Sequence, residues 1–451
     1  MPHINAMAKE GITMTDFYNT AAVSTPSRYG LLTGRYNFRS RLKMGILLPG
    51  DSTLIEKERQ TIASSLRDAG YSTAAIGKWH LGFDWPIVDE SKRPKNSTSL
   101  CTEMDFTQQI KGGPMSAGFD YFFGMDTPNF PPYAFIENGY IVGEIPTYIE
   151  NNPSSGWPGL SQQNWNFQQV APAIQSKVLA YIENNSHQEK PFFLYYSLTI
   201  PHTPIVPESR FKNKSAAGDY GDFVVQVDEY VGEIIAKLKA LKIDDRTIVI
   251  FMSDNGPANI ASGEKNTPGS FPGALKKLYD HDCAGGLRGM KGDLWEAGSR
   301  VPCIVYAPGL FPESYISNEI MSAADIFPTI ASIAGARVKD AAAEDGYDMS
   351  GIWMKKESAK NVREAIVLHS SQGFFAIRQG DWKLLLHKSS GGGLSTVWKL
   401  DLYNSPFDGQ LYNLKEDITE QNNLYDKYPD KVKHLTSLLE SYKEKGRSNK
   451  R

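Results

Sequence analysis

The chain has 451 residues, of which 41% are hydrophobic, 11% aromatic and 22% charged. This composition is typical of a folded protein with a sizeable core, and it excludes a disordered chain. The length predicts one large domain with an appendage, or two to three domains. With a net charge of −3, no basic field favours nucleic acid or an anionic membrane surface. The sequence also has no apolar run of the roughly 20 residues that a membrane span needs.

The three cysteines, Cys101, Cys283 and Cys303, are too few for a disulfide scaffold and too scattered for a zinc site. The first residues show no charged region followed by an apolar run, so no signal peptide is visible.

Apolar strand-like runs alternate with helical patterns through the first two thirds of the chain. In chain order, the pattern predicts a helix over 61–69, a strand over 72–76, a strand over 191–198, an amphipathic helix over about 221–241, and strands over 247–252 and 301–306. This alternation predicts an α/β fold whose sheet is mainly parallel and covered on both faces. In such sheets, functional groups gather beyond the carboxyl ends of the strands.

The rest of the chain has different patterns. Residues 96–166 are rich in Gly, Pro, Asn and aromatics, which indicates long loops and short hairpins over the rim of the sheet. A polar stretch over 355–361 marks a boundary. Beyond it, the sequence predicts short antiparallel strands over 365–368, 374–378, 382–386 and 397–402, and a closing helix over about 429–445. We therefore expect a main α/β domain over 1–358 and a C-terminal sheet-and-helix subdomain over 359–451.

The strongest local signal is the segment from Ser24 to Arg35, which reads Ser-Thr-Pro-Ser-Arg-Tyr-Gly-Leu-Leu-Thr-Gly-Arg. Pro26 suits the first turn of a helix, so Ser24 is expected at a helix N-terminus, near unpaired N–H groups. The segment resembles the signature of the type I sulfatases, Cys/Ser-x-Pro-Ser-Arg followed by Leu-Thr-Gly-Arg. The resemblance implies an alkaline phosphatase-like sandwich, with a large mostly parallel sheet between helices and a small C-terminal antiparallel sheet with a helix.

In that family the first residue of the signature is oxidised to Cα-formylglycine, whose hydrated aldehyde attacks sulfur and later expels sulfate. The resemblance makes Ser24 the precursor of this group and Arg28 a catalytic residue beside it. A serine at this position is similar to the family's serine-type branch, which is matured by a radical enzyme in some bacteria. A cysteine replaced by serine is the alternative, and the sequence leaves both open.

Two further motifs are similar to those of the family. The first, Gly-Lys-Trp-His-Leu-Gly, spans 77–82 after a predicted strand. Lys78 and His80 alternate along it, so their side chains can face the same way. The resemblance implies that Lys78 binds the sulfate and that His80 removes the proton that starts sulfate release. The second, Pro-His-Thr-Pro, places His202 after the 191–198 strand, where the family has a residue for the sulfate and the leaving oxygen, with general acid among its roles.

Asp254 and Asn255 end the 247–252 strand, and their adjacent side-chain oxygens suit Ca²⁺ or, less well, Mg²⁺. A bare Asp-Asn-Gly is usually a turn; the resemblance favours metal ligation.

The segment over 287–302 is similar to the family's Lys-Gly-x-x-Trp/Tyr-Glu-Gly-Gly-x-Arg-Val-Pro, with Ala297 where a glycine is usual. By resemblance, Lys291 binds the sulfate and assists the departing alcohol, while Glu296 and Arg300 are structural partners. His281 is expected either to contact the ring that bears the sulfate or to be a surface residue.

The family begins with a strand that ends in two adjacent aspartates, which supply half of the metal ligands. Here the opening residues 1–11 resemble the helix after that strand, and only Asp16 precedes Ser24 among the aspartates. We therefore expect an N-terminally truncated sequence that lacks the first strand, with a degenerate protein as the alternative.

Together these motifs predict a sulfatase, arylsulfatase-like, that hydrolyses sulfate esters of glycan fragments through a formylglycine nucleophile. The expected partners are a sulfated carbohydrate substrate and a radical-type maturase, and the expected location is periplasmic or extracellular in a bacterium. Two other functions are retained. One is a non-catalytic binder of sulfated glycans, and the other is a phosphoester or phosphonate hydrolase of the same superfamily.

Overall fold

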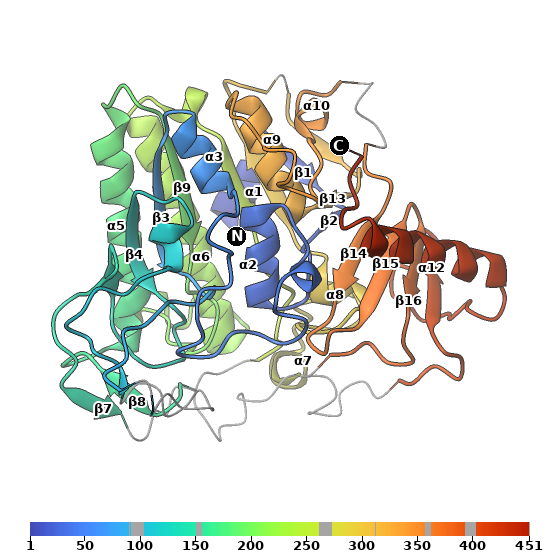
Figure 1. Cartoon of the computed structure of the whole chain (residues 1–451), viewed down its shortest axis with the longest axis horizontal. Helices are drawn as coiled ribbons and strands as arrows, with labels where there is room; N and C mark the ends of the chain where they lie inside the picture. The colour runs from blue at the N-terminus through green and yellow to red at the C-terminus, as the bar shows by residue number, and fades with distance from the viewer. Residues whose placement is uncertain are drawn as a thin grey trace. The chain divides into compact units, whose positions relative to one another are not determined.

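The computed structural model describes residues 1–89, 91, 103–149, 156–260, 273–311, 313–356, 362–392 and 403–450. The chain divides into two compact units, each built from separate stretches of sequence (Figure 1). The first contains 1–6, 47–247 and 260–279, and the second contains 7–46, 248–259 and 280–451. Helix α1 (Pro2–Glu10) passes from the first unit into the second.

The first unit contains a five-stranded sheet in the order β6-β5-β4-β3-β9. Its strands are β3 (Ser72–Lys78), β4 (Tyr121–Met125), β5 (Ile136–Glu137), β6 (Tyr140–Ile141) and β9 (Phe192–Ser197). Strand β3 pairs in parallel with both β4 and β9, whereas β5 and β6 form a hairpin antiparallel to β4. The carboxyl ends of three neighbouring strands therefore lie at one edge of this sheet.

Three helices of the first unit pack around this sheet and each other: α3 and α5 contact β3, and α5 also packs against α6. Helix α3 begins after Thr61, which forms a reciprocal capping box with Ser64. The remaining short elements include the β7–β8 hairpin. The bounds of the helices and of the β7–β8 hairpin in the first unit are α3 (Ile62–Asp68), α4 (Gly113–Ser116), β7 (Thr147–Ile149), β8 (Gly159–Ser161), α5 (Val170–Ser186), α6 (Gly218–Ala240) and α7 (Ala274–Tyr279).

The second unit contains a mixed sheet in the order β10-β11-β1-β12. Its strands are β1 (Ile12–Met14), β10 (Val249–Met252), β11 (Cys303–Tyr306) and β12 (Tyr315–Ser317). Strand β11 is antiparallel to both β10 and β1, while β1 is parallel to β12. The second unit also contains a pair of short strands, β2 (Phe17–Tyr18) and β13 (Met321–Ser322). Its helices in this part are α2 (Ser24–Thr33), α8 (Glu296–Ser299), α9 (Ile326–Ile333) and α10 (Ser350–Trp353).

The C-terminal part of the second unit is an antiparallel sheet crossed by helix α12 (Figure 1). The sheet runs β14 (Ile366–His369), β15 (Phe375–Gln379), β16 (Trp382–Leu385) and β17 (Gln410–Asn413), and the helix is α12 (Pro429–Glu444). Leu435 and Leu439 of α12 are fully buried against Ile377 and Leu384 of the sheet. Burying such side chains is the main source of stability for a short sheet of this kind.

Most predicted elements are confirmed, and the mainly apolar runs are strands as expected. The interpretation of 96–166 as loops and hairpins alone was wrong, because β4 lies in that region and pairs in parallel with the centre of the sheet. The strand predicted over 397–402 lies outside the described residues. The domain boundary at 358/359 stays a prediction. None of the helices in the described part of the chain is long and apolar enough to cross a membrane.

His369, at the end of β14, is a histidine buried in an aromatic environment. Its ring centroid lies 4.9 Å from that of Phe375 and 6.2 Å from that of Phe38. The Nδ2 of Asn37 lies 3.2 Å from its Nδ1. Burial lowers the pKa of His369 to about 4, and the cations Lys43 and Lys443 act in the same direction. The folded protein therefore keeps this ring neutral.

This depressed pKa predicts acid destabilisation. Between pH 6.5 and 4 the unfolded chain binds a proton at His369 and the folded chain does not, so the stabilisation present above pH 6.5 is lost as the pH falls. The contribution is up to about 3 kcal/mol. Urea unfolding of the parent and of His369→Phe across this range is the measurement. The slope of unfolding free energy against pH should be shallower in the variant, and equal slopes would contradict the assignment.

Candidate active site

Ser24 is the first residue of helix α2, as the sequence predicted. The helix ends at Gly34, which adopts the left-handed conformation with a φ of 65° and donates its N–H to the Gly30 carbonyl. Gly30 is required for another reason, because a Cβ there would lie 2.2 Å from the hydroxyl of Thr20. Helix α2 is thereby packed tightly against Thr20, and Ser24 is buried at its first position.

The Ser24 hydroxyl meets the end of strand β10. Its Oγ donates a hydrogen bond to Asp254 Oδ2 at 2.8 Å and lies 3.5 Å from Asn255 Oδ1. Arg28, one turn further along α2, donates from Nε and a terminal nitrogen to the same Asp254 oxygen, at 3.0 and 2.7 Å. The hydroxyl of Ser24 and the guanidinium of Arg28 therefore meet at one carboxylate oxygen of Asp254.

The Asp254 loop is fixed by backbone contacts on either side. The Nδ2 of Asn19 donates to the Ser253 carbonyl at 2.9 Å, and the N–H of Gly256 donates to the Gly298 carbonyl at 2.9 Å. A Cβ on Gly256 would lie 1.6 Å from the carbonyl oxygen of Ala297, so only glycine allows this approach. The loop after β10 is thus joined to helix α8.

Lys291 belongs to the same group of residues. Its N–H donates to the Pro257 carbonyl, and the N–H of Gly292 donates to the Ala22 carbonyl, just before Ser24. Burial lowers the pKa of Lys291; Arg28 acts in the same direction and Asp254 opposes it. The second unit therefore brings together Ser24, Arg28, Asp254, Asn255 and Lys291.

A chain of buried ion pairs supports this group from the C-terminal sheet. Lys383 of β16 is fully buried between Glu296, at 2.8 Å, and Glu420, at 2.9 Å. Glu420 also accepts the backbone N–H of Glu296 at 2.7 Å. Arg300 pairs with Glu296 at 3.1 Å, so both residues are structural partners, as predicted.

The network continues to the start of the second unit. Asp16 accepts from Arg300 at 3.0 Å and pairs with Arg378 at 2.6 Å, and Tyr18 donates to Glu296. Burial raises the pKa of Glu296, but the cations around it outweigh this and hold that pKa low. Burial raises the pKa of Glu420, and Glu296 acts in the same direction. These charges connect α8 to β2, β15 and β16.

In the first unit, Lys78 and His80 lie at the end of β3, and both are buried. Gly77 has a φ of 116°, and a Cβ there would lie 2.0 Å from the Ser197 carbonyl of β9. The backbone N–H of His80 donates to Asp126 Oδ1 at 3.1 Å, and its Nε2 lies 3.1 Å from the Leu47 carbonyl. Because a carbonyl only accepts, Nε2 carries a proton.

His202 follows β9, which is parallel to β3, so it lies at the same sheet edge as Lys78 and His80. Its Nδ1 lies 2.7 Å from the Thr203 carbonyl, which again assigns the proton to that nitrogen. His202 is partly exposed. The three predicted residues Lys78, His80 and His202 thus end or follow two neighbouring parallel strands of the first unit.

The donors for a metal ion are incomplete in the described part of the chain. Asp254 and Asn255 supply two adjacent hard oxygens, which suit Ca²⁺ in kind. However, Arg28 already pairs with Asp254, and Lys291 adds a second positive charge. Among the described residues, no cluster of three or more His, Cys, Asp or Glu side chains could hold a metal ion. These residues do not by themselves fit a dication.

The fold and these groups of cations, histidines and a buried hydroxyl define an ester hydrolase of the alkaline phosphatase-like class. The sequence profile of the sulfatase family matches residues 1–336. The chain therefore belongs to the sulfatase family and is a sulfuric ester hydrolase.

Named relatives support this assignment. The N-acetylgalactosamine-6-O-sulfatase of Bacteroides thetaiotaomicron is 34% identical over 480 residues, which cover 98% of this chain and 88% of that protein. Arylsulfatase A of Homo sapiens is 28% identical over 450 residues, covering 94% and 78%. A solved sulfatase structure from work on glycosaminoglycan metabolism by Bacteroides thetaiotaomicron has a TM-score of 0.82 at 32% identity, covering 98% of this chain and 94% of that one.

Sequence reasoning missed the residues that position the predicted ones. Lys383 alternates with apolar residues in a strand, so it resembles a solvent-facing lysine, and Glu420 lies in a polar turn-like segment. Asp126 follows a strand that was not predicted. His281 is exposed on the loop after α7, and its contact with substrate stays a prediction.

Replacing Lys383 by methionine tests the buried network. Lys383→Met leaves Glu296 and Glu420 without the cation between them, so we expect the free energy of unfolding to fall by about 3–5 kcal/mol. Lys388→Met, at an exposed lysine of the same sheet region, is the matched control and should change stability by about 0.5 kcal/mol or less. Denaturant unfolding measures both. A loss below that of the control would show that the network does not stabilise the fold.

Proposed function

We propose that this protein hydrolyses sulfate esters of glycans through Ser24 after its oxidation to formylglycine. The observation that carries the proposal is the convergence of the Ser24 hydroxyl, Asp254 and Arg28 at the start of α2. The named relatives that act on N-acetylgalactosamine 6-O-sulfate or on aryl sulfates support the substrate class. The hydrated aldehyde would supply a nucleophile that can also expel the bound sulfate.

Arg28 and Lys291 would supply charge stabilisation. Transfer of a sulfuryl group spreads negative charge over oxygens, which fixed cationic donors stabilise better than water does. Arg28 is held by Asp254 in one orientation, so little reorganisation is needed. The lowered pKa of Lys291 makes its ammonium a stronger acid, which suits a residue that assists the departing alcohol.

His80 and His202 would supply the proton transfers. His80 directs its Nε2 proton at the Leu47 carbonyl, so we assign the removal of a proton to the other ring nitrogen, Nδ1. His202 donates from Nδ1 to the Thr203 carbonyl, so it would protonate the leaving oxygen from Nε2 as an imidazolium, which keeps the Nδ1 proton after the transfer. Lys78 would bind the sulfate.

Three further parts of the proposal rest on the family resemblance. A divalent metal, Ca²⁺ in preference to Mg²⁺, would use Asp254 and Asn255 together with ligands outside those described. A radical-type maturase would oxidise Ser24. A periplasmic or extracellular location also stays a prediction.

The maturation of Ser24 is tested by mass spectrometry of the tryptic peptide Glu10–Arg28 from protein made in its native host. We expect a deficit of about 2 Da, because oxidation of the serine hydroxyl to an aldehyde removes two hydrogens. Ser24→Ala provides the matched control, which cannot be oxidised in this way. An unmodified Ser24 in active protein would contradict the proposal, whereas an unmodified Ser24 in protein that binds sulfated glycans without turnover would favour the binder.

His80 is tested by steady-state kinetics on an aryl sulfate. His80→Gln removes the proposed base, and we expect kcat to fall by about 10²–10⁴-fold. The control is His187→Gln, which changes an exposed histidine after α5 and should keep the parent kcat. Parallel turnover of the matched aryl phosphate separates the two hydrolase functions. A parent enzyme that prefers phosphate, or a His80 variant with unchanged kcat, would refute the assignment.

A further inference from the structure

Strand β3 ends at Lys78, and the chain turns sharply just beyond it. The N–H of Trp79 donates to the Met125 carbonyl at 2.8 Å, which completes the pairing of Lys78 with Met125. His80 then adopts a left-handed backbone conformation, with a φ of 56°. A residue in that conformation no longer follows the alternation of a strand, so β3 alone does not set the direction of the His80 side chain.

The backbone N–H of His80 has a side chain as its acceptor. It donates to Asp126 Oδ1 at 3.1 Å, and Asp126 directly follows the last residue of β4. Because β3 and β4 are parallel, both residues lie just beyond the carboxyl ends of neighbouring strands. The carboxylate thus holds the backbone of His80 in a conformation that is otherwise unfavourable for a residue with a side chain.

The segment over 47–54 also contacts this turn. His80 Nε2 donates to the Leu47 carbonyl at 3.1 Å, and a Cβ on Gly82 would lie 2.4 Å from the Ser52 carbonyl oxygen. Both of these groups are backbone carbonyls, which a substitution leaves in place. The acceptor on Asp126 is a side chain, so its contribution can be removed and measured.

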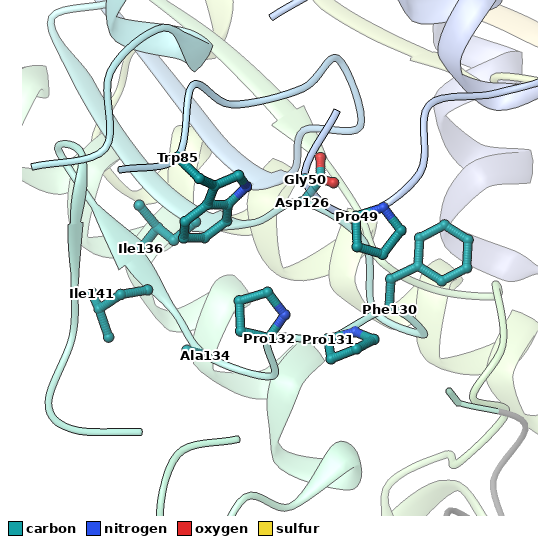
Figure 2. Close-up of a pocket in the computed structure, with 10 residues that line it drawn as sticks. All are labelled: Pro49, Gly50, Trp85, Asp126, Phe130, Pro131, Pro132, Ala134, Ile136 and Ile141. Carbon is teal, nitrogen blue, oxygen red and sulfur yellow. The ribbon is translucent and has the colours of Figure 1, made fainter. Parts of the chain in front are cut away.

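Figure 2 shows Asp126 in the wall of a small pocket, together with Trp85, Phe130 and Pro131. The pocket lies next to His80, because the Phe130 ring meets the His80 ring edge-on, with 6.2 Å between the ring centroids. It has room for about one water molecule, so a substituent of a sugar does not fit there. The contact with His80, and not this pocket, therefore points to the role of Asp126.

We propose that Asp126 is a positioning residue, which holds His80 in the orientation that its proton transfer requires. Asp126 acts through the backbone of His80 and has no contact with substrate in this role. The inference rests on the proposed function, which makes His80 a base, and adds to it the residue that aims this base. The contact requires an acceptor oxygen at Oδ1, which the amide of an asparagine also supplies and an alanine does not.

The test measures kcat and KM on an aryl sulfate for Asp126→Ala and Asp126→Asn. Loss of the acceptor in Asp126→Ala releases the backbone of His80, so we expect kcat to fall by about 10–100-fold while KM changes little. Asp126→Asn keeps an acceptor oxygen and should retain most of the parent kcat. Hydrogen exchange gives a readout that needs no activity, because the amide of His80 should exchange faster in Asp126→Ala than in the parent or in Asp126→Asn.

Asp120→Ala is the matched control. Asp120 accepts the backbone N–H of Thr73 at 3.0 Å, so it forms the same kind of bond at the amino ends of β3 and β4. Its loss should lower stability in urea unfolding about as much as the loss of Asp126 does, and it should leave kcat unchanged.

Combining Asp126→Ala with His80→Gln separates positioning from general damage. If Asp126 acts through His80, Asp126→Ala should lower kcat no further once His80 is replaced, whereas independent effects would multiply. Full multiplication, an Asp126→Ala variant with the kcat of the parent, or an Asp126→Asn variant as impaired as Asp126→Ala would overturn the positioning role and leave the proposed function intact. A His80→Gln variant with unchanged kcat would instead overturn the base assignment in the proposed function, and this inference with it.

Discussion

The second unit depends on one buried cation, Lys383, which lies between Glu296 and Glu420. Burying these charges costs much of their hydration, and the cost is offset only if each charge keeps its partners. Glu420 meets this requirement by accepting the backbone N–H of Glu296 as well. The position of α8 relative to the C-terminal sheet is thereby specified by charge pairing, because few other arrangements would satisfy all three groups.

This constraint reaches Ser24 through the backbone. Helix α8 carries Gly298, whose carbonyl accepts from Gly256 in the loop that follows β10. That loop presents Asp254 to both Ser24 and Arg28. A structural network in the C-terminal sheet and the Ser24 hydroxyl at the start of α2 are thus parts of one arrangement. This explains why the segment over 287–302 combines a sulfate-binding candidate, Lys291, with the structural residues Glu296 and Arg300.

Those parts of the fold and of the candidate site that have a local sequence signal could be predicted from the sequence. The start of α2 at Ser24 and the placement of Lys78, His80 and His202 after parallel strands both follow from strand and helix patterns that end at a motif. The supporting residues have no local signal, because their roles arise only when distant segments meet. Lys383 and Glu420 are separated from Glu296 by 87 and 124 positions. Strand β4 was missed because it is short and lies in a stretch rich in Gly, Pro, Asn and aromatic residues, which is also typical of loops.

In the first unit, a charged side chain likewise holds a neighbouring residue in place. His80 has a φ of 56°, a left-handed backbone conformation that is unfavourable by of order 1 kcal/mol or more for a residue with a side chain. Two contacts hold it there, one from its N–H to Asp126 and one from its ring to the Leu47 carbonyl. Because Asp126 also forms a wall of the neighbouring pocket, one carboxylate fixes the orientation of His80 and faces the pocket. The parallel register of β3 and β4 pairs Lys78 with Met125, so His80 and Asp126 meet just beyond the ends of these two strands.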